Sequence, residues 1–355
     1  MKILLTGICG FVGQTLARAL LEHLADLEII GLDNLIRPGS EMNRHQLVPF
    51  GVKFIHADLR SATDVETLPP ADWVIDAAAN PSVLAGLENP AASRQLVEHN
   101  LGGTINLLEY CHRAQAGFTL LSTSRVYSIE PLAALQMDVA DSAFVPKHDQ
   151  PWPAGCSAQG IAENFSTQPP LSLYGSTKLA SEILAAEYGA AFGFPVWLNR
   201  CGVLAGAGQF GRADQGIFSY WIHSYCRKRP LRYIGFDGKG CQVRDCLHPA
   251  DLVPVLVQQF QQPSPRPEPP LNFGGGVHNS VSLAQLTDWC AARFDAHTIS
   301  SDPTPRPFDL PWVVMDCHAA EQRWNWKPQR GIDVVLEEIA RHADENPLWL
   351  DLTSD

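Results

Sequence analysis

The sequence predicts an α/β protein with a doubly wound parallel sheet, and two observations lead to this prediction. Short apolar runs alternate with longer amphipathic segments through the first half of the chain, which is the pattern of strands joined by crossover helices. A glycine-rich turn directly follows the first apolar run, at the strand-to-helix junction that is typical of such sheets. We expect a smaller, mostly C-terminal second domain beside the sheet.

Six apolar runs are candidate strands of the predicted sheet. They lie at residues 2–6, 28–33, 52–57, 73–77, 119–122 and 196–200. Between the first two, apolar residues recur at helical spacing and predict a helix with one face against the sheet, formed by Val12, Leu16, Ala19, Leu20 and Leu24.

The predicted domain boundaries follow from where this alternation stops. We assign residues 1–200 to the first domain, whose core also takes in residues 250–274, and residues 201–249 and 275–355 to a discontinuous second domain. Residues 128–170 are rich in proline, glycine and polar side chains, which predicts a long loop or excursion that serves a site. Residues 263–270 (PSPRPEPP) predict an exposed, extended connector.

Composition excludes several classes of protein. The chain has 355 residues and a formal net charge of −12 without a run of lysine or arginine, which argues against nucleic acid or an anionic membrane as a partner. We expect a cytoplasmic globular protein, because no leader pattern opens the sequence and no apolar run is long enough to span a bilayer. Nine cysteines without regular spacing predict reduced thiols, and Cys241, Cys246 and His248 lack the spacing of a metal site, so we expect no metal.

The glycine-rich turn predicts a dinucleotide site. Gly7, Gly10 and Gly13 permit a tight turn and a close approach of a pyrophosphate to the amino terminus of the helix. Asp33 ends the second strand and can accept hydrogen bonds from ribose hydroxyls, whereas a 2′-phosphate there would meet like charge, so NAD is favoured over NADP. Arg37 keeps NADP open as an alternative. The expected contacts also include Phe11, Val12 and Asn34.

Tyr174 and Lys178 lie four residues apart and share one face of a predicted helix. The ammonium group of Lys178 would stabilise the Tyr174 phenolate and lower its pKa, so that the tyrosine could exchange a proton with a hydroxyl near neutral pH. A Tyr-x-x-x-Lys pair is common by itself, and its significance here comes from its position downstream of a dinucleotide-binding pattern.

The glycine turn and the Tyr-x-x-x-Lys pair together resemble the extended short-chain dehydrogenase/reductase superfamily, whose fold is of the Rossmann type. This resemblance implies that Thr123, within STSRVY at residues 122–127, is catalytic together with Tyr174 and Lys178. It also implies cofactor contacts by Asp58, Leu59, Ala77, Ala78, Ala79, Asn100, Tyr174, Lys178 and Cys201. Sugar-nucleotide 4,6-dehydratases carry an Asp-Glu pair after the threonine, but this chain has Ser124 and Arg125, so dehydration is not expected.

A more specific resemblance is to CDP-tyvelose (CDP-paratose) 2-epimerases. It depends on QFGRADQG at residues 209–216, QVRD at 242–245 followed by LHPADL at 247–252, and FGGG at 273–276 followed by Asn279 and Ser282. The resemblance implies that Arg244 contacts the nucleotide diphosphate. The residues implied to contact the substrate are Asn80, Ser82, Ser124, Arg125, Val203, Gln209, Phe210, Gln215, Arg244 and Arg306.

The reaction implied by this resemblance is epimerisation of a CDP-linked sugar at carbon 2. Tyr174 would take the proton of a sugar hydroxyl while NAD accepts hydride, and the resulting keto sugar would turn over before hydride returns. The resemblance also implies a homodimer, formed by the helices that follow Asn100 and Tyr174. Alternatives are a 4-epimerase or a dehydrogenase/reductase, which would share Thr123, Tyr174 and Lys178, and a non-catalytic NAD-sensing protein, which would need neither Tyr174 nor Lys178.

Overall fold

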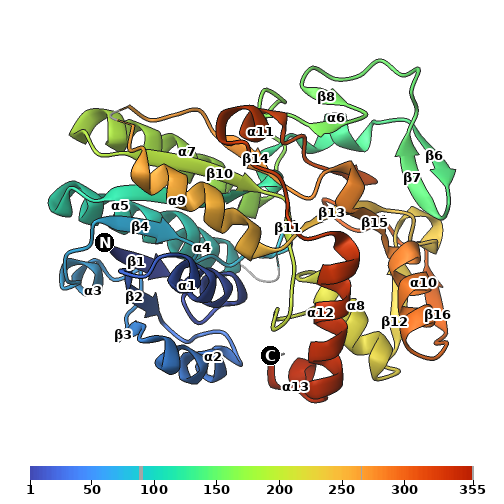
Figure 1. Ribbon diagram of the computed structural model, residues 1–355. Coiled ribbons are helices and arrows are strands. Elements are labelled where there is room, and N and C mark those ends of the chain that lie inside the picture. Colours follow the sequence, from blue (N-terminus) through green and yellow to red (C-terminus); the bar gives the residue numbers. More distant parts are fainter. Residues whose placement is uncertain (88–90, 265, 354–355) are drawn as a thin grey trace.

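A computed structural model describes residues 1–87, 91–264 and 266–353. Its centre is a seven-stranded parallel sheet with the strand order β14-β10-β5-β4-β1-β2-β3 (Figure 1). The predicted doubly wound α/β fold is therefore confirmed. The strands are β1 (Lys2–Thr6), β2 (Glu28–Asp33), β3 (Lys53–His56), β4 (Trp73–Asp76), β5 (Gly117–Thr123), β10 (Val196–Cys201) and β14 (Leu271–Phe273).

The order of the strands reverses at β1, which pairs with β2 on one side and with β4 on the other. The connections therefore diverge from this point, and they leave a crevice at the carboxyl ends of the strands, which is where ligands bind in such sheets. All six predicted strands belong to the sheet. The seventh strand, β14, pairs with β10 at the edge and was not predicted as a strand.

Helices cover both faces of the sheet, so its central strands read as continuous apolar runs and β5 is buried along its whole length. One face packs against α1 (Phe11–His23), α9 (Val253–Gln261) and α11 (His318–Trp324). The predicted apolar stripe of α1 buries Leu16 and Leu20 there. The other face packs against α3 (Ala62–Glu66), α5 (Gly103–Ala114) and α7 (Leu173–Phe192), while α2 (Ser40–Leu47) and α4 (Ala92–Val97) lie in connections.

Elements that follow β10 surround a separate core on the right of Figure 1, in the region where the second domain is expected. Its helices are α8 (Ile217–Cys226), α10 (Leu283–Arg293), α12 (Ile332–Glu345) and the terminal α13 (Trp349–Thr353). One small sheet contains β11 (Val203–Leu204), β13 (Val243–Leu247), β15 (Ser280–Ser282) and β17 (Trp312–Val313), and another pairs β12 (Leu231–Ile234) with β16 (Ile299–Asp302). The chain enters this region directly from the carboxyl end of β10, at the edge of the sheet where the crevice lies.

The proline-rich segment 128–170 is a structured excursion. It contains α6 (Ile129–Ala133), the hairpin of β6 (Met137–Ala140) and β7 (Ala143–Pro146), and the short pair of β8 (Cys156–Ser157) and β9 (Gly160–Ile161). Its buried side chains pack against residues 310–315 of the second domain. Part of the predicted connector 263–270 lies outside the described residues, since Pro265 is one of those left out. Within the described ranges, no helix has the length and apolar character needed to cross a membrane.

Candidate active site

Two adjoining cavities occupy the crevice at the carboxyl ends of the strands. One contains Asp33 and Asp58 and is called here the Asp33 cavity. The other contains Tyr174 and is lined by both domains; it is called the Tyr174 cavity. They meet at the glycine turn, because Gly7 and Gly10 line both.

The glycine turn forms a cradle that has no room for side chains. Gly7 has a φ of +62°, and a Cβ atom on it would lie 3.0 Å from the Cα of Ala78. A Cβ atom on Gly13 would lie 2.2 Å from the carbonyl oxygen of Gly7, so the first turn of α1 packs directly on the loop. The unpaired N–H groups of this helix start face the crevice, which suits the pyrophosphate of a dinucleotide. The residues therefore fit NAD.

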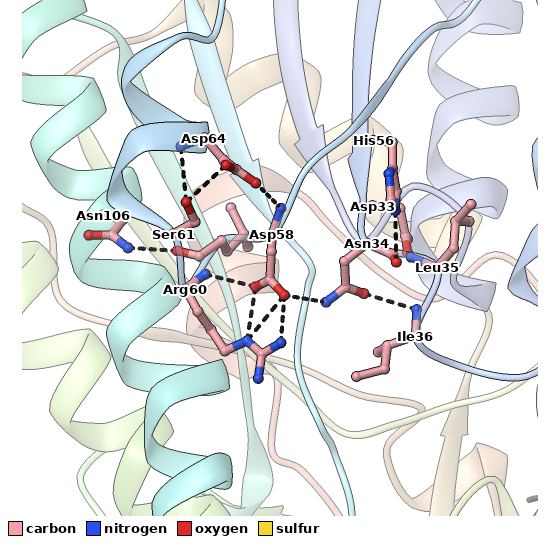
Figure 2. Close-up of polar contacts among 11 residues, drawn as sticks. Asp33, Asn34, Leu35, Ile36, His56, Asp58, Arg60, Ser61, Asp64 and Asn106 are labelled. Carbon is pink, nitrogen blue, oxygen red and sulfur yellow. Dashed lines mark hydrogen bonds and ion pairs between the residues drawn. The ribbon is translucent and has the colours of Figure 1, made fainter.

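Asp33 and Asp58 lie side by side at the ends of β2 and β3 (Figure 2). The carboxylate of Asp33 accepts hydrogen bonds from the backbone N–H groups of Cys9 and Leu35, both at 2.9 Å, and burial raises its pKa. Asp58 accepts from the side-chain amide of Asn34 at 3.2 Å, and its hydrogen-bonded Arg60 partner holds its pKa well below the usual range. Both carboxylates border the cavity, so hydroxyl groups of a ribose can reach them.

We expect the protein to bind NAD(H) more tightly than NADP(H), because the Asp33 carboxylate repels a 2′-phosphate. Asp33→Asn retains an acceptor for the Cys9 N–H group but loses the negative charge. This variant should bind NADH roughly tenfold more weakly and should show a smaller preference for NADH over NADPH. Fluorescence titration with NADH and NADPH measures both effects. Equal affinity of the unmodified protein for the two nucleotides would contradict this assignment.

The predicted catalytic residues line the Tyr174 cavity together. Thr123 ends β5, Tyr174 and Lys178 lie in the first turns of α7, and Cys201 ends the neighbouring β10. The helix begins where it does because Ser172 caps it, accepting a hydrogen bond from the Gly175 N–H group at 3.0 Å. This cap fixes the two helical residues next to the strand ends.

The pKa of Tyr174 differs from the sequence-based expectation. Burial raises the pKa of Tyr174 to about 12, and the opposing influences come from Thr123 and Arg125 rather than from Lys178. Burial also lowers the pKa of Lys178. In the part of the chain that the structure describes, the Lys178 ammonium group has no hydrogen-bond or ion-pair partner. A buried ammonium group beside a cavity is suited to hydrogen-bonding a ligand hydroxyl.

Asn100 does not line either cavity. Its side-chain oxygen accepts a hydrogen bond from the Asn80 N–H group at 2.8 Å, and its amide donates to the Asn80 carbonyl at 3.1 Å and to the Thr177 hydroxyl at 3.2 Å. The buried amide thus ties the loop after β4 to α7. A contact between Asn100 and the cofactor stays a prediction, and the observed contacts are those of a structural residue.

Three arginines predicted to contact the substrate line the Tyr174 cavity: Arg125, Arg244 and Arg306. Arg244 forms an ion pair of 2.9 Å with Asp309, and both side chains are largely buried. The same cavity contains Ser124, Val203, Gln209, Phe210 and Gln215. Asn80 and Ser82, which the resemblance placed at the substrate, line the Asp33 cavity instead.

Sequence reasoning missed several lining residues of the Tyr174 cavity, among them Asp214, Gln242, Phe308 and Asp309. Asp214 and Gln242 lie within motifs that had been recognised, so their neighbours were the available signal. Ser82 donates a hydrogen bond of 2.5 Å to Asp214, which joins the first domain to the QFGRADQG segment. Phe308 and Asp309 had no signal beyond their closeness to Arg306.

The chain belongs to the NAD dependent epimerase/dehydratase family, whose model matches residues 3–274. It is 30% identical over 307 residues to a CDP-paratose 2-epimerase from Salmonella typhi, covering 82% of this chain and 85% of that one. It is 24% identical over 358 residues to a UDP-glucuronate 4-epimerase from Thermodesulfobacterium geofontis, covering 97% and 96% of the two chains.

Solved structures share the fold. The crystal structure of UDP-glucuronic acid 4-epimerase from Bacillus cereus, in complex with UDP-glucuronic acid and NAD, superposes with a TM-score of 0.75 at 22% identity and covers 97% of this chain and 99% of that one. The family model and the relative from Salmonella typhi confirm the predicted superfamily, the enzyme class and the dependence on NAD. The protein is an NAD-dependent sugar-nucleotide epimerase/dehydratase family enzyme.

Proposed function

We propose that this protein epimerises a CDP-linked sugar at carbon 2 of the sugar. The observation that carries the proposal is that Thr123, Tyr174 and Lys178 line the same cavity as three arginines. Proton-transfer groups thus lie beside cations suited to a diphosphate. Ser124 and Arg125 occupy the positions where a dehydratase would need an acid and a base, which supports epimerisation over elimination of water.

Each catalytic side chain has a defined task in this proposal. Tyr174 removes the proton of the reacting hydroxyl and returns it at the end of the cycle, and Thr123 hydrogen-bonds the same oxygen. Lys178 donates hydrogen bonds to the nicotinamide ribose, and its charge favours the phenolate. NAD, when bound, supplies the hydride acceptor and donor, so no net oxidation occurs. The keto sugar turns over in the cavity between the two transfers.

The remaining residues hold the two ligands. The proposed cofactor contacts are Gly7, Gly10, Phe11, Val12, Gly13, Asp33, Asn34, Asp58, Leu59, Ala77, Ala78, Ala79 and Cys201, all of which border the two cavities. Arg244 contacts the diphosphate through its planar, permanently charged guanidinium group, helped by Arg125 and Arg306. The choice of carbon 2 and of cytidine is supported by the relative from Salmonella typhi and by the shared QFGRADQG and QVRD motifs.

Isotope labelling tests the proposed reaction. CDP-paratose that carries deuterium on carbon 2 should react more slowly than unlabelled substrate and should keep its label in the epimer, because the hydride never leaves the closed site. Deuterium on carbon 4 should have no such effect on the rate. Replacement of the label by solvent hydrogen would indicate direct deprotonation, and a rate effect only from carbon 4, or turnover of UDP-glucuronate instead, would indicate a 4-epimerase.

We also propose that two chains form a homodimer through α5 and α7. Exposed apolar side chains on and beside these helices support this surface: Ile183 on α7 is 57% exposed and Val97 at the end of α4 is 40% exposed. Apolar side chains gathered on packed helices commonly mark an interface between subunits.

We expect the purified protein to have about twice the mass of one 38.9 kDa chain in light scattering at micromolar concentration. Ile183→Glu should shift it towards the monomer, since it places a charge in the proposed interface. Val334→Glu is a matched control, because Val334 is equally exposed at 56% but lies on α12 of the other domain. A monomeric mass for the unmodified protein would contradict the proposal.

A further inference from the structure

Two loops from distant parts of the chain meet where the two cavities adjoin. One loop, residues 34–40, follows β2 and borders the Asp33 cavity. The other loop, residues 209–216, follows β11 and borders the Tyr174 cavity. Arg37 of the first loop and Gln215 of the second line both cavities, and Arg37 Nη1 donates a hydrogen bond to Gln215 Oε1 at 3.0 Å. A ligand that extends through both cavities therefore passes this contact.

The ring of Phe210 joins the second loop to two further parts of the chain. The guanidinium carbon of Arg37 lies 5.0 Å from the centre of this ring, and Arg37 Nη2 donates to the Phe210 carbonyl at 3.5 Å. The indole of Trp349 is stacked on the same ring, with 5.6 Å between the ring centres and 11° between the planes. Trp349 Nε1 also donates to the Gln209 carbonyl at 2.9 Å. These ring contacts fix the position of the loop 209–216.

The helix that begins at Trp349, α13, also contacts the first loop. It lies between α2 and α8 (Figure 1). Thr353 is fully buried, and its Cγ2 atom packs on Gly39, since a Cβ atom on Gly39 would lie only 2.7 Å from it. Trp349 and Leu350 belong to one apolar cluster, against which Met42 of α2 is packed. One short helix therefore contacts both loops.

The two faces of α13 differ. Trp349 and Leu350 are 5% exposed and contact the rest of the protein, whereas Leu348 and Leu352 are 60% and 52% exposed. A helix of five residues is not stable by itself in water, so α13 keeps its place through the contacts of its buried face. A few contacts near the end of a chain can open while the rest of the fold stays intact. The helix is thus suited to releasing and recapturing the two loops.

We propose that α13 is a latch that holds the loops 34–40 and 209–216 together beside bound NAD, with Trp349 and Thr353 as its positioning residues. Neither residue lines either of the two cavities, so the latch acts through the loops and not by touching the coenzyme. NAD enters or leaves the crevice when the loops part, and α13 sets how often they do. The inference concerns the coenzyme and is independent of which sugar nucleotide reacts.

Exchange of NADH, followed by stopped-flow fluorescence, tests the latch without depending on turnover. Trp349→Ala removes the ring stacked on Phe210 and the donor to Gln209, so the rates of NADH association and dissociation should both rise about tenfold. Trp349→Phe keeps a ring and loses only the donor, so both rates should rise only about threefold. Because the loops part more often for entry and for exit alike, the Kd for NADH should stay within about threefold of that of the unmodified protein.

Thr353→Arg tests whether the latch depends on both loops. An arginine has no room against Gly39 and would bury a charge there, so α13 should lose its contact with the first loop. Trp349 keeps its partners in the loop 209–216, yet NADH association and dissociation should again become about tenfold faster. Exchange at the rate of the unmodified protein would show that α13 supports only the loop 209–216, and the latch would be overturned.

The exposed face of α13 supplies the matched control. Leu352→Ala removes an apolar side chain from the same helix, and both rates should stay unchanged because Leu352 is largely exposed. The melting temperature of each variant reports on folding. If Trp349→Ala raised the dissociation rate alone, with a proportional rise in Kd, the substitution would have damaged the binding site, and the proposal would be wrong. A lower melting temperature of this variant with unchanged exchange rates would make α13 a purely structural element and would equally overturn the proposal.

Discussion

Replacing Tyr174 by phenylalanine is expected to slow epimerisation by about two to four orders of magnitude, which is the usual contribution of a general acid–base group. The substitution removes the oxygen that we propose exchanges the proton, and it keeps the ring of this buried α7 residue. NADH affinity should therefore stay close to that of the unmodified protein. Steady-state kcat with CDP-paratose and titration with NADH measure the two quantities.

Lys178→Met separates the role of the tyrosine from that of its helical neighbour. Lys178 is buried and faces the cavity without a partner in the described chain, and we propose that it binds the ribose. This variant should lose kcat and NADH affinity together, whereas Tyr174→Phe should lose kcat alone. A Tyr174→Phe enzyme that keeps most of its kcat would remove the tyrosine from the mechanism.

Replacing Glu182 by alanine is expected to destabilise the fold by about 3–5 kcal/mol, because it leaves a buried guanidinium group without its counter-charge. Glu182 on α7 pairs with Arg200 on β10 at 2.7 Å, and both side chains are no more than 6% exposed. Ser122 of β5 hydrogen-bonds the same carboxylate. The pair thus joins α7, which carries Tyr174 and Lys178, to the two strands that carry Thr123 and Cys201. Urea unfolding at pH 7, followed by circular dichroism, gives the change in the free energy of unfolding.

An exposed ion pair in the same domain supplies the control. Arg94 and Glu98 lie 2.6 Å apart, and their side chains are 84% and 43% exposed. Glu98→Ala should leave the free energy of unfolding almost unchanged, since water screens such pairs. A similarly small change for Glu182→Ala would mean that water reaches Arg200 once the carboxylate is gone. Replacing Glu182 and Arg200 together by apolar residues should restore much of the stability.

Local patterns in the sequence were sufficient for much of the fold and for the centre of the site. Short apolar runs identified six strands of the sheet, because a strand covered on both faces is apolar throughout, and helical spacing identified α1. The glycine turn and the pair of Tyr174 and Lys178 were recognisable for the same reason, since all their residues lie on one turn or one helix. The seventh strand, β14, was missed because its three residues, Leu-Asn-Phe, are too few to stand out as an apolar run.

What the tertiary structure alone decided concerns groups that are far apart in the sequence. Phe308 reaches Arg125 across 183 positions and Asp309 reaches Arg244 across 65, and nothing in either local sequence specifies the other. The loop after β4 places Asn80 and Ser82 at the Asp33 cavity. Asn100 forms hydrogen bonds with the backbone of Asn80 in that loop. Burial, set by the packing of both domains, raised the pKa of Tyr174 where its neighbour Lys178 was expected to lower it. The sequence by itself thus determined which residue types are present and on which elements they lie. The distances between these residues and their burial depend on packing between distant segments, which local sequence patterns do not encode.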